Sequence, residues 1–147
     1  MTKTYKQRTT SLGLGALLGA LTGLSILILA LATQFFVLPH GPNSAPEMGP
    51  LGTFFVFSLL FSVSYVCIFL VAAIPSFLVL YARIEHIRLW QWLLYGGTLF
   101  GFGIPILNRF FSGPTNFGST MYEAALGSAA GIASFWVVHI SCQQNAT

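Results

Sequence analysis

Charged residues are nearly absent from this chain. Only 6% of its 147 residues are charged, and aspartate does not occur at all. A typical soluble domain carries about 25% charged residues, because these side chains cover its water-facing surface. A chain that is 55% hydrophobic cannot cover such a surface, and lipid is the solvent that suits it. We therefore expect an integral membrane protein, with the lipid bilayer as its first partner.

Residues that bind metals and cofactors are also scarce. Cys67 and Cys142 form no CxxC pair, so neither a disulfide nor a zinc site is expected. His40, His86 and His139 stand singly near the ends of apolar runs. A metal or haem site between His86 and His139 is the minor alternative. We expect no metal and no cofactor.

The sequence also lacks motifs of catalysis and of phosphate binding. It has no nucleophile elbow, phosphate-binding loop, HExxH or dinucleotide fingerprint. The net charge of +3 is small, and the basic residues cluster at the ends of apolar runs. That pattern indicates membrane orientation and not nucleic-acid binding. We expect a protein that is not an enzyme.

Four apolar runs dominate what is present, and they predict membrane spans at about residues 12–38, 51–81, 89–107 and 121–140. Crossing the hydrocarbon core as a helix takes about 20 residues. Barrel strands alternate apolar and polar residues over about 10 positions, whereas these runs are continuous. Only a helix satisfies its own backbone within one segment. We predict one all-α domain over residues 1–147, an antiparallel bundle of four transmembrane helices.

The connections between the runs carry the expected signals for loops. Residues 39–50, PHGPNSAPEMGP, and 108–120, NRFFSGPTNFGST, are rich in proline, glycine and polar residues. Pro75 is expected to kink the long second run. The fourth run is the least hydrophobic, and Thr120 and Glu123 fit a capping box that would open its helix.

Lysine and arginine predict the orientation. Three precede the first run, none lies in the first loop, two lie in the second, one in the third and none in the tail. The positive-inside rule therefore places the N-terminus and the C-terminus in the cytoplasm. Aromatic residues flank the predicted interfaces, at Tyr81, Trp90 and Trp92 on one side and at Phe110, Phe111 and Tyr122 on the other.

A cleaved signal peptide is the alternative for the first run. Its lysine-rich start and the Ala30–Ala32 stretch fit such a peptide. The run is longer than a typical signal core and continues through Val37, which favours a retained span.

Small residues recur at helical spacing in three of the runs. The candidate packing residues are Gly15, Gly19, Gly23, Gly97, Gly101, Gly127 and Gly131. Residues four apart share one helix face, so each set makes a groove into which another backbone fits. We expect these grooves to pack the chain's own helices, and a homo-oligomer interface or a pore lining is the alternative.

Glu123 is the only acidic residue inside a predicted span. Ionisable residues in the membrane are candidates for function. Besides the capping role, Glu123 could form a proton or cation site, opposite Arg109. A weak stripe of hydroxyl groups, from Ser58 and Ser62 with Ser25 opposite, could line a path beside Tyr65.

Two function classes remain after these exclusions. The first is a non-enzymatic protein that acts through helix–helix contacts, as a membrane subunit, a regulator or an immunity-type protein. Its partner would be another membrane protein or a second copy of itself. The second is a small oligomeric transporter or channel. The ending with Gly127, Gly131 and Trp136 resembles that of many small bacterial inner-membrane proteins, a resemblance that implies no particular activity. We expect a multi-pass protein of the plasma membrane, in particular of the bacterial inner membrane.

Overall fold

The computed structural model describes residues 5–36, 49–81, 88–113 and 117–144, and all secondary structure within them is helical. The elements are α1 (Tyr5–Phe36), α2 (Gly49–Ile68), the π-helix η1 (Phe69–Ala73), α3 (Ile74–Tyr81), α4 (Leu89–Ser112) and α5 (Phe117–Gln144). Because α2, η1 and α3 follow one another without a break, the described chain forms four helical rods. His40, His86 and most of the predicted proline-rich loop lie outside the described residues.

Three of the helical rods are long and apolar enough to cross a bilayer. The stretches concerned are Gly13–Gln34, Leu51–Phe77 and Phe117–Ser141. The predicted fourth run, which is rich in small residues and corresponds to α5, thus has the length and hydropathy of a span. Among the four described rods, α4 is the one that does not reach this hydropathy. Gln91, four glycines and the Asn108–Arg109 pair lower its hydropathy.

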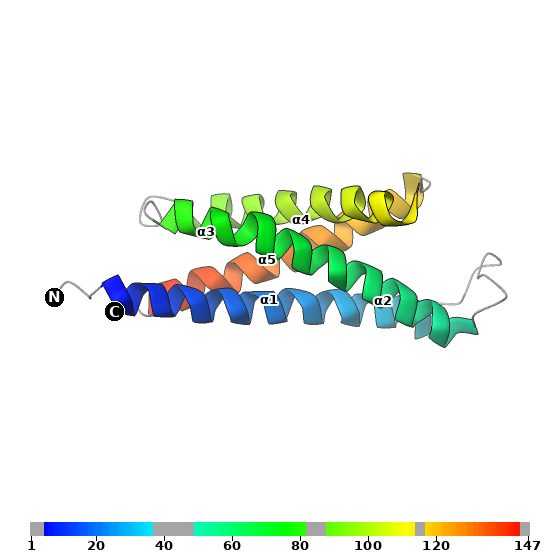
Figure 1. Cartoon of the computed structure of the whole chain (residues 1–147), viewed down its shortest axis with the longest axis horizontal. Helices are drawn as coiled ribbons and strands as arrows, with labels where there is room; N and C mark the ends of the chain where they lie inside the picture. The colour runs from blue at the N-terminus through cyan, green and yellow to red at the C-terminus, as the bar shows by residue number, and fades with distance from the viewer. Residues whose placement is uncertain (1–4, 37–48, 82–87, 114–116, 145–147) are drawn as a thin grey trace.

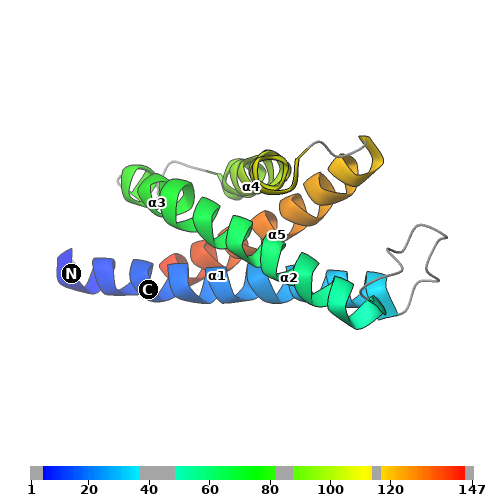
Figure 2. The ribbon, with the colours of Figure 1, turned by 45° about the vertical axis from the view of Figure 1, so that its right-hand side comes forward.

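The four rods form a closed arrangement in which α5 lies between α1 and α4 (Figures 1 and 2). The α2 helix crosses diagonally and contacts both α1 and α4. Figure 1 also shows that α1 begins and α5 ends at the same end of the molecule. The first and last helices of the chain are therefore direct neighbours.

Glycines let α1 approach α5 closely. A Cβ atom added to Gly19 would lie 2.7 Å from the Ser134 carbonyl oxygen and 2.9 Å from a methyl carbon of Val138. A Cβ added to Gly15 would lie 3.0 Å from the Ser141 Cβ. The first glycine groove is therefore filled by the chain's own last helix.

A second close approach joins α4 to α5. A Cβ added to Gly131 would meet the backbone of Gly96 and lie 2.9 Å from the Phe100 Cβ, and one added to Gly127 would meet the Phe100 backbone. Gly101 faces the Ser128 side chain. Within a membrane, helices associate by such van der Waals contact, because lipid tails are as apolar as the side chains.

The π-helix η1 lies directly before Pro75. The Ile74 N–H bonds to the Phe69 carbonyl, five residues back, which widens the helix by one residue. A proline has no N–H, and its ring crowds the carbonyl four residues earlier. The wide turn opens the helix next to this crowded position. The Ser76 hydroxyl then donates to the Ala72 carbonyl at 2.6 Å.

The two predicted boundaries beside the third connection are wrong, and each makes the predicted helix too short. The α4 helix continues past Leu107 to Ser112, where Gly113 ends it with a φ of 81° and an N–H bond to the Arg109 carbonyl at 2.9 Å. The α5 helix begins at Phe117, so Thr120 lies inside the first turn and is not the N-cap. The predicted capping box is therefore wrong.

Trp92 is a core residue and does not anchor the interface as predicted. Its side chain is 1% exposed, whereas that of Trp90 is 58% exposed. The indole N–H donates to the Phe135 carbonyl at 2.8 Å, and the ring packs against Phe77 and Phe135. Trp90 and Trp92 differ in exposure because residues two apart on a helix lie on different faces.

We predict that Gly131→Ala will destabilise the bundle, because the new methyl group would collide with the α4 backbone. Overpacking of this kind costs about 1–3 kcal/mol. The matched control is Gly13→Ala, since a Cβ there has no atom within 4 Å. Alanine also favours a helix over glycine, so the control should unfold at the wild-type temperature or above it. Thermal unfolding in detergent, followed by circular dichroism, measures both, and equal transitions for the two variants would contradict the packing described.

Candidate functional site: a buried polar cluster

Glu123 lies inside the helix bundle. It stands six residues into α5, and only 6% of its surface is exposed. Helix α5 carries it towards α4, on the same side as Gly127 and Gly131. A carboxyl group in this position has lost most of its contact with solvent, so its partners decide whether it is tolerated.

Asn108 is the partner, and it links Glu123 to a third helix. The Asn108 amide nitrogen donates to Glu123 Oε2 at 3.3 Å. The Asn108 amide oxygen accepts from the Ser64 hydroxyl at 2.7 Å. Asn108 is 1% exposed and Ser64 is fully buried. The three side chains form a directed row of hydrogen bonds from α2 through α4 to α5, which we call the polar cluster.

Arg109 lies next to the polar cluster. Its guanidinium donates to the Thr120 hydroxyl at 3.1 Å and remains exposed. Thr120 lies one helical turn before Glu123 on α5, and the guanidinium is within electrostatic reach of the Glu123 carboxyl. The structure thus brings the two predicted polar residues, Glu123 and Arg109, to the same region. Arg109 binds the first turn of α5, while Asn108 makes the contact with the carboxylate.

The chemistry open to the polar cluster is that of a single carboxyl group. Asn108 and Ser64 do not ionise at ordinary pH, so only Glu123 can gain or lose a proton. Its oxygens could also bind a monovalent cation. The described residues contain no group of three histidines, cysteines or acidic side chains that could hold a metal ion. The arrangement suits reversible binding of a small cation better than covalent catalysis, which needs a nucleophile beside a base.

A second buried polar pair lies one residue further along α2. The hydroxyl groups of Tyr65 and Ser134 lie 2.6 Å apart, and Ser134 also donates to the Ala130 carbonyl at 2.7 Å. Gly23 provides the space, because a Cβ there would collide with both hydroxyl oxygens. Consecutive residues of α2, Ser64 and Tyr65, thus bond to α4 and to α5 respectively.

The predicted hydroxyl stripe does not form as expected. Ser25 donates to the Leu21 carbonyl of its own helix at 2.7 Å and is exposed. The Ser58 hydroxyl is buried without a hydrogen-bond partner among the described residues. The Tyr65 hydroxyl bonds to Ser134 and not to α1. A hydroxyl on a lipid-exposed helix face can still bond to the carbonyl four residues earlier, and this removes any need for a neighbour.

The prediction from sequence missed Asn108 and Ser64. Asn108 begins a polar, proline-containing stretch, and the sequence therefore predicts it to lie in the third loop. Ser64 was one of several serines in apolar runs, and its spacing does not distinguish it from the rest. Asn108 lies 15 residues before Glu123, across a short connection. This spacing places the two residues on facing turns of neighbouring antiparallel helices, and it is the feature of the sequence that points to Asn108.

We predict that Ser64→Ala will lower the stability of the bundle by about 1–2 kcal/mol, because it leaves a buried amide oxygen of Asn108 without a donor. Ser25→Ala is the matched control, since it removes an exposed hydroxyl that bonds only to its own helix. That variant should stay within about 0.5 kcal/mol of the wild type. Unfolding by denaturant in micelles, followed by tryptophan fluorescence, measures the difference. Equal stabilities would mean that Ser64 does not support the cluster.

No family model, curated protein or solved structure matches the chain. The function therefore has to be inferred from the polar cluster and from the arrangement of the helices.

Proposed function

We propose that the protein spans the plasma membrane four times, as a multi-pass protein of a bacterial inner membrane with both termini in the cytoplasm. Helix α4, which corresponds to the predicted third run, is then a span in addition to the three more apolar helices. Its 24 residues extend about 36 Å, which exceeds the hydrocarbon thickness of about 30 Å. Large apolar side chains are exposed along the whole length of α4, as expected of a surface in contact with lipid. These are Trp90, Leu94, Phe102, Ile106 and Phe110.

The arrangement of the helix ends supports an even number of crossings, because α1 begins where α5 ends (Figure 1). Lys6 and Arg8 belong to the first turns of α1, and Arg88 directly precedes α4, which begins at the same end (Figure 1). In the sequence, Lys3 precedes α1 and Arg83 lies between α3 and α4. The positive-inside rule then assigns this end to the cytoplasm.

We predict that green fluorescent protein fused to either terminus will fluoresce in cells, whereas alkaline phosphatase at either terminus will stay inactive. The first folds in the cytoplasm and the second only outside it. Each reporter inserted after Asn43, in the predicted first loop, should give the opposite result. Active phosphatase at one terminus and fluorescence at the other would mean an odd number of spans.

We infer that Glu123 binds a proton or a monovalent cation, and that the protein is a small transporter or channel. The observation that carries this proposal is the burial of an ionisable side chain within a membrane-spanning segment, held by Asn108 from a second helix and through it by Ser64 from a third. Burying a carboxyl group is costly, so such residues are usually retained for function. A purely structural contact between three helices would not need an ionisable group.

Transport across vesicle membranes tests this role. We predict that proteoliposomes holding the wild-type protein will take up protons or monovalent cations down an imposed gradient, and that Glu123→Gln will abolish the uptake. Glutamine has nearly the same shape and can still accept from Asn108, so the fold should survive. A pH-sensitive dye detects protons, and sodium or potassium gradients at constant pH test the other cations.

The matched control for this experiment is Glu85→Gln, which removes an acidic group from the predicted cytoplasmic connector and should leave uptake unchanged. Uptake by Glu123→Gln at the wild-type rate would refute the proposed role of the carboxyl group. So would the absence of any flux through correctly folded wild-type protein.

The second candidate function is action through helix contacts with another membrane protein. The observation in its favour is the outer face of α2, where large apolar side chains point away from the bundle. This face includes Phe55, Leu59 and Val63. A partner that co-purifies at fixed stoichiometry and is lost when Leu59 becomes alanine would support this function over transport.

A further inference from the structure

Asn108 lies in the middle of the polar cluster, where its amide is a donor at one end and an acceptor at the other. The amide nitrogen donates to Glu123 Oε2 at 3.3 Å, and the amide oxygen accepts from the Ser64 hydroxyl at 2.7 Å. Asparagine and serine side chains can each donate and accept, whereas a carboxyl group can donate only when it carries a proton. The protonation state of Glu123 therefore sets the direction of the whole row.

A neutral Glu123 reverses the row. Its O–H group donates to the Asn108 amide oxygen once the amide has turned end for end, and the amide nitrogen then donates to the Ser64 oxygen. The Ser64 hydroxyl donates in turn to the Leu60 carbonyl, four residues earlier on α2. Water supplies the one proton that binds, and no other proton leaves its heavy atom. Each of the three side chains thus keeps a hydrogen bond in both protonation states of Glu123.

The bond that Ser64 makes in the reversed row is common in this structure. Thr22, Ser76 and Ser134 each donate to the carbonyl four residues earlier, at 2.8, 2.6 and 2.7 Å. Ser64 donates to Asn108 instead, although its own helix offers an acceptor of the same kind. The Ser64 hydroxyl therefore has two alternative acceptors, one on α4 and one on α2.

The surroundings of the Glu123 carboxyl suit a proton better than a metal ion. A sodium or potassium ion gives up its water only where several protein oxygens replace it. The neighbour of Glu123 Oε2 is instead the Asn108 amide nitrogen, which points its hydrogen at the carboxylate. The Arg109 guanidinium adds a positive charge within electrostatic reach. A metal ion would be repelled by both, whereas a proton forms an O–H bond and removes the charge of the carboxylate.

The ionisable groups on α1, α4 and α5 near Glu123 keep their charge state at ordinary pH. Arg109 stays protonated, and the phenol of Tyr122, the preceding residue on α5, is neutral. The apolar stretch of α1, Gly13–Gln34, contains no ionisable side chain. His139 also belongs to α5, but it lies about 24 Å further along the helix axis.

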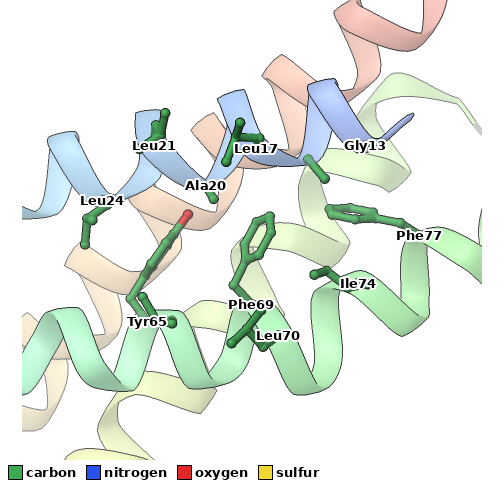
Figure 3. A pocket seen from close by; sticks show the side chains of 12 residues that line it. Gly13, Leu17, Ala20, Leu21, Leu24, Tyr65, Phe69, Leu70, Ile74 and Phe77 are labelled. Carbon is green, nitrogen blue, oxygen red and sulfur yellow. The ribbon is translucent and has the colours of Figure 1, made fainter. Parts of the chain in front are cut away.

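Helix α2 carries two titratable side chains, Tyr65 and Cys67. Tyr65 faces away from Glu123, because Figure 3 shows its ring opposite Ala20 and Leu24 of α1, and its hydroxyl pairs with Ser134. A free cysteine and a tyrosine ordinarily titrate well above neutral pH. The carboxyl of Glu123 is therefore the group of the polar cluster that changes charge.

We propose that the polar cluster is selective for a proton over sodium and potassium, and that Asn108 turns its amide when the proton binds. Asn108 is thus a positioning residue, which carries the protonation state of Glu123 on α5 to Ser64 on α2. This inference rests on the proposed role of Glu123 as the cation-binding group, but its test does not need transport to be observed.

Infrared difference spectra between acidic and basic pH detect a carboxyl group that gains a proton. The chain has three acidic side chains, so the band that is lost in Glu123→Gln and kept in Glu85→Gln belongs to Glu123. We predict the same titration midpoint when choline chloride is replaced by sodium or potassium chloride at equal ionic strength. A competing cation at ten times its dissociation constant would lower the apparent proton affinity about tenfold. Such a shift with either cation would overturn the proposal.

A carbon-13 label in the side-chain amide of asparagine tests whether Asn108 turns. Replacing Asn43, Asn116 and Asn145, which lie outside the described residues, by glutamine leaves Asn108 as the one labelled amide. We predict that its carbonyl band changes with the same midpoint as the carboxyl band of Glu123. An amide band that stays constant while Glu123 titrates would overturn the proposal, because a purely structural asparagine keeps one orientation.

Ser64→Ala in this labelled protein separates the two orientations. At basic pH the Asn108 oxygen loses its donor, so the amide carbonyl band should shift relative to that of the wild type. At acidic pH the Glu123 O–H is the donor, and the band should stay in place. Ser25→Ala is the matched control and should shift the band at neither pH. A shift in Ser64→Ala at both pH values, or at neither, would overturn the proposal.

This inference and the proposed transport fail in different measurements. Competition by sodium or potassium overturns the selectivity for a proton, but it leaves Glu123 as the group that binds the transported cation. An absence of flux through folded protein whose Glu123 still titrates overturns transport and leaves the inference standing. The spectra are recorded in detergent micelles and need no gradient, so a loss of flux cannot be mistaken for a loss of proton binding.

Discussion

Close contact between helix backbones on both sides of α5 is the constraint on which the other interactions depend. Gly19 admits the Ser134 carbonyl from one side, and Gly131 admits the backbone of Gly96 from the other. In lipid there is no hydrophobic drive between helices, so contact of this kind supplies much of the attraction. Once α5 is fixed between α1 and α4, its polar residues come within reach of both α2 and α4. The bonds of Ser134 to Tyr65 and of Glu123 to Asn108 follow from that placement.

The same glycine contacts weaken the support for a protein that acts through helix contacts with partners. In the sequence, the small-residue faces are the main positive support for a protein that acts through contacts with partners. In the structure Gly15, Gly19, Gly127 and Gly131 all face neighbouring helices of the same chain. A partner would have to use the large apolar side chains of α2, which also suit plain contact with lipid. Contact with lipid does not explain the buried carboxyl group of Glu123. Its burial favours the proposal that the protein binds a cation.

The sequence predicts the helical class well, because continuous apolar runs leave only one way to satisfy a backbone in lipid. It predicts the polar cluster poorly. Asn108 and Arg109 look like the end of a span, yet the helix continues because Ser64, Glu123 and Thr120 satisfy them. Those partners lie on other helices, so no local pattern reveals them. The π-helix before Pro75 and the burial of Trp92 are likewise set by packing between helices.

Ser64 and Tyr65 connect the two buried polar groups physically. Ser64 ends the row of hydrogen bonds that begins at Glu123, and Tyr65 bonds to Ser134 of α5. They are consecutive on one helical turn, so a rotation of α2 that moves one side chain moves the other. Only one further helical turn separates them from the wide turn of η1, where the helix has an extra residue to absorb such a rotation. A cation at Glu123 that altered the position of α2 would therefore alter the contact between Tyr65 and Ser134 as well.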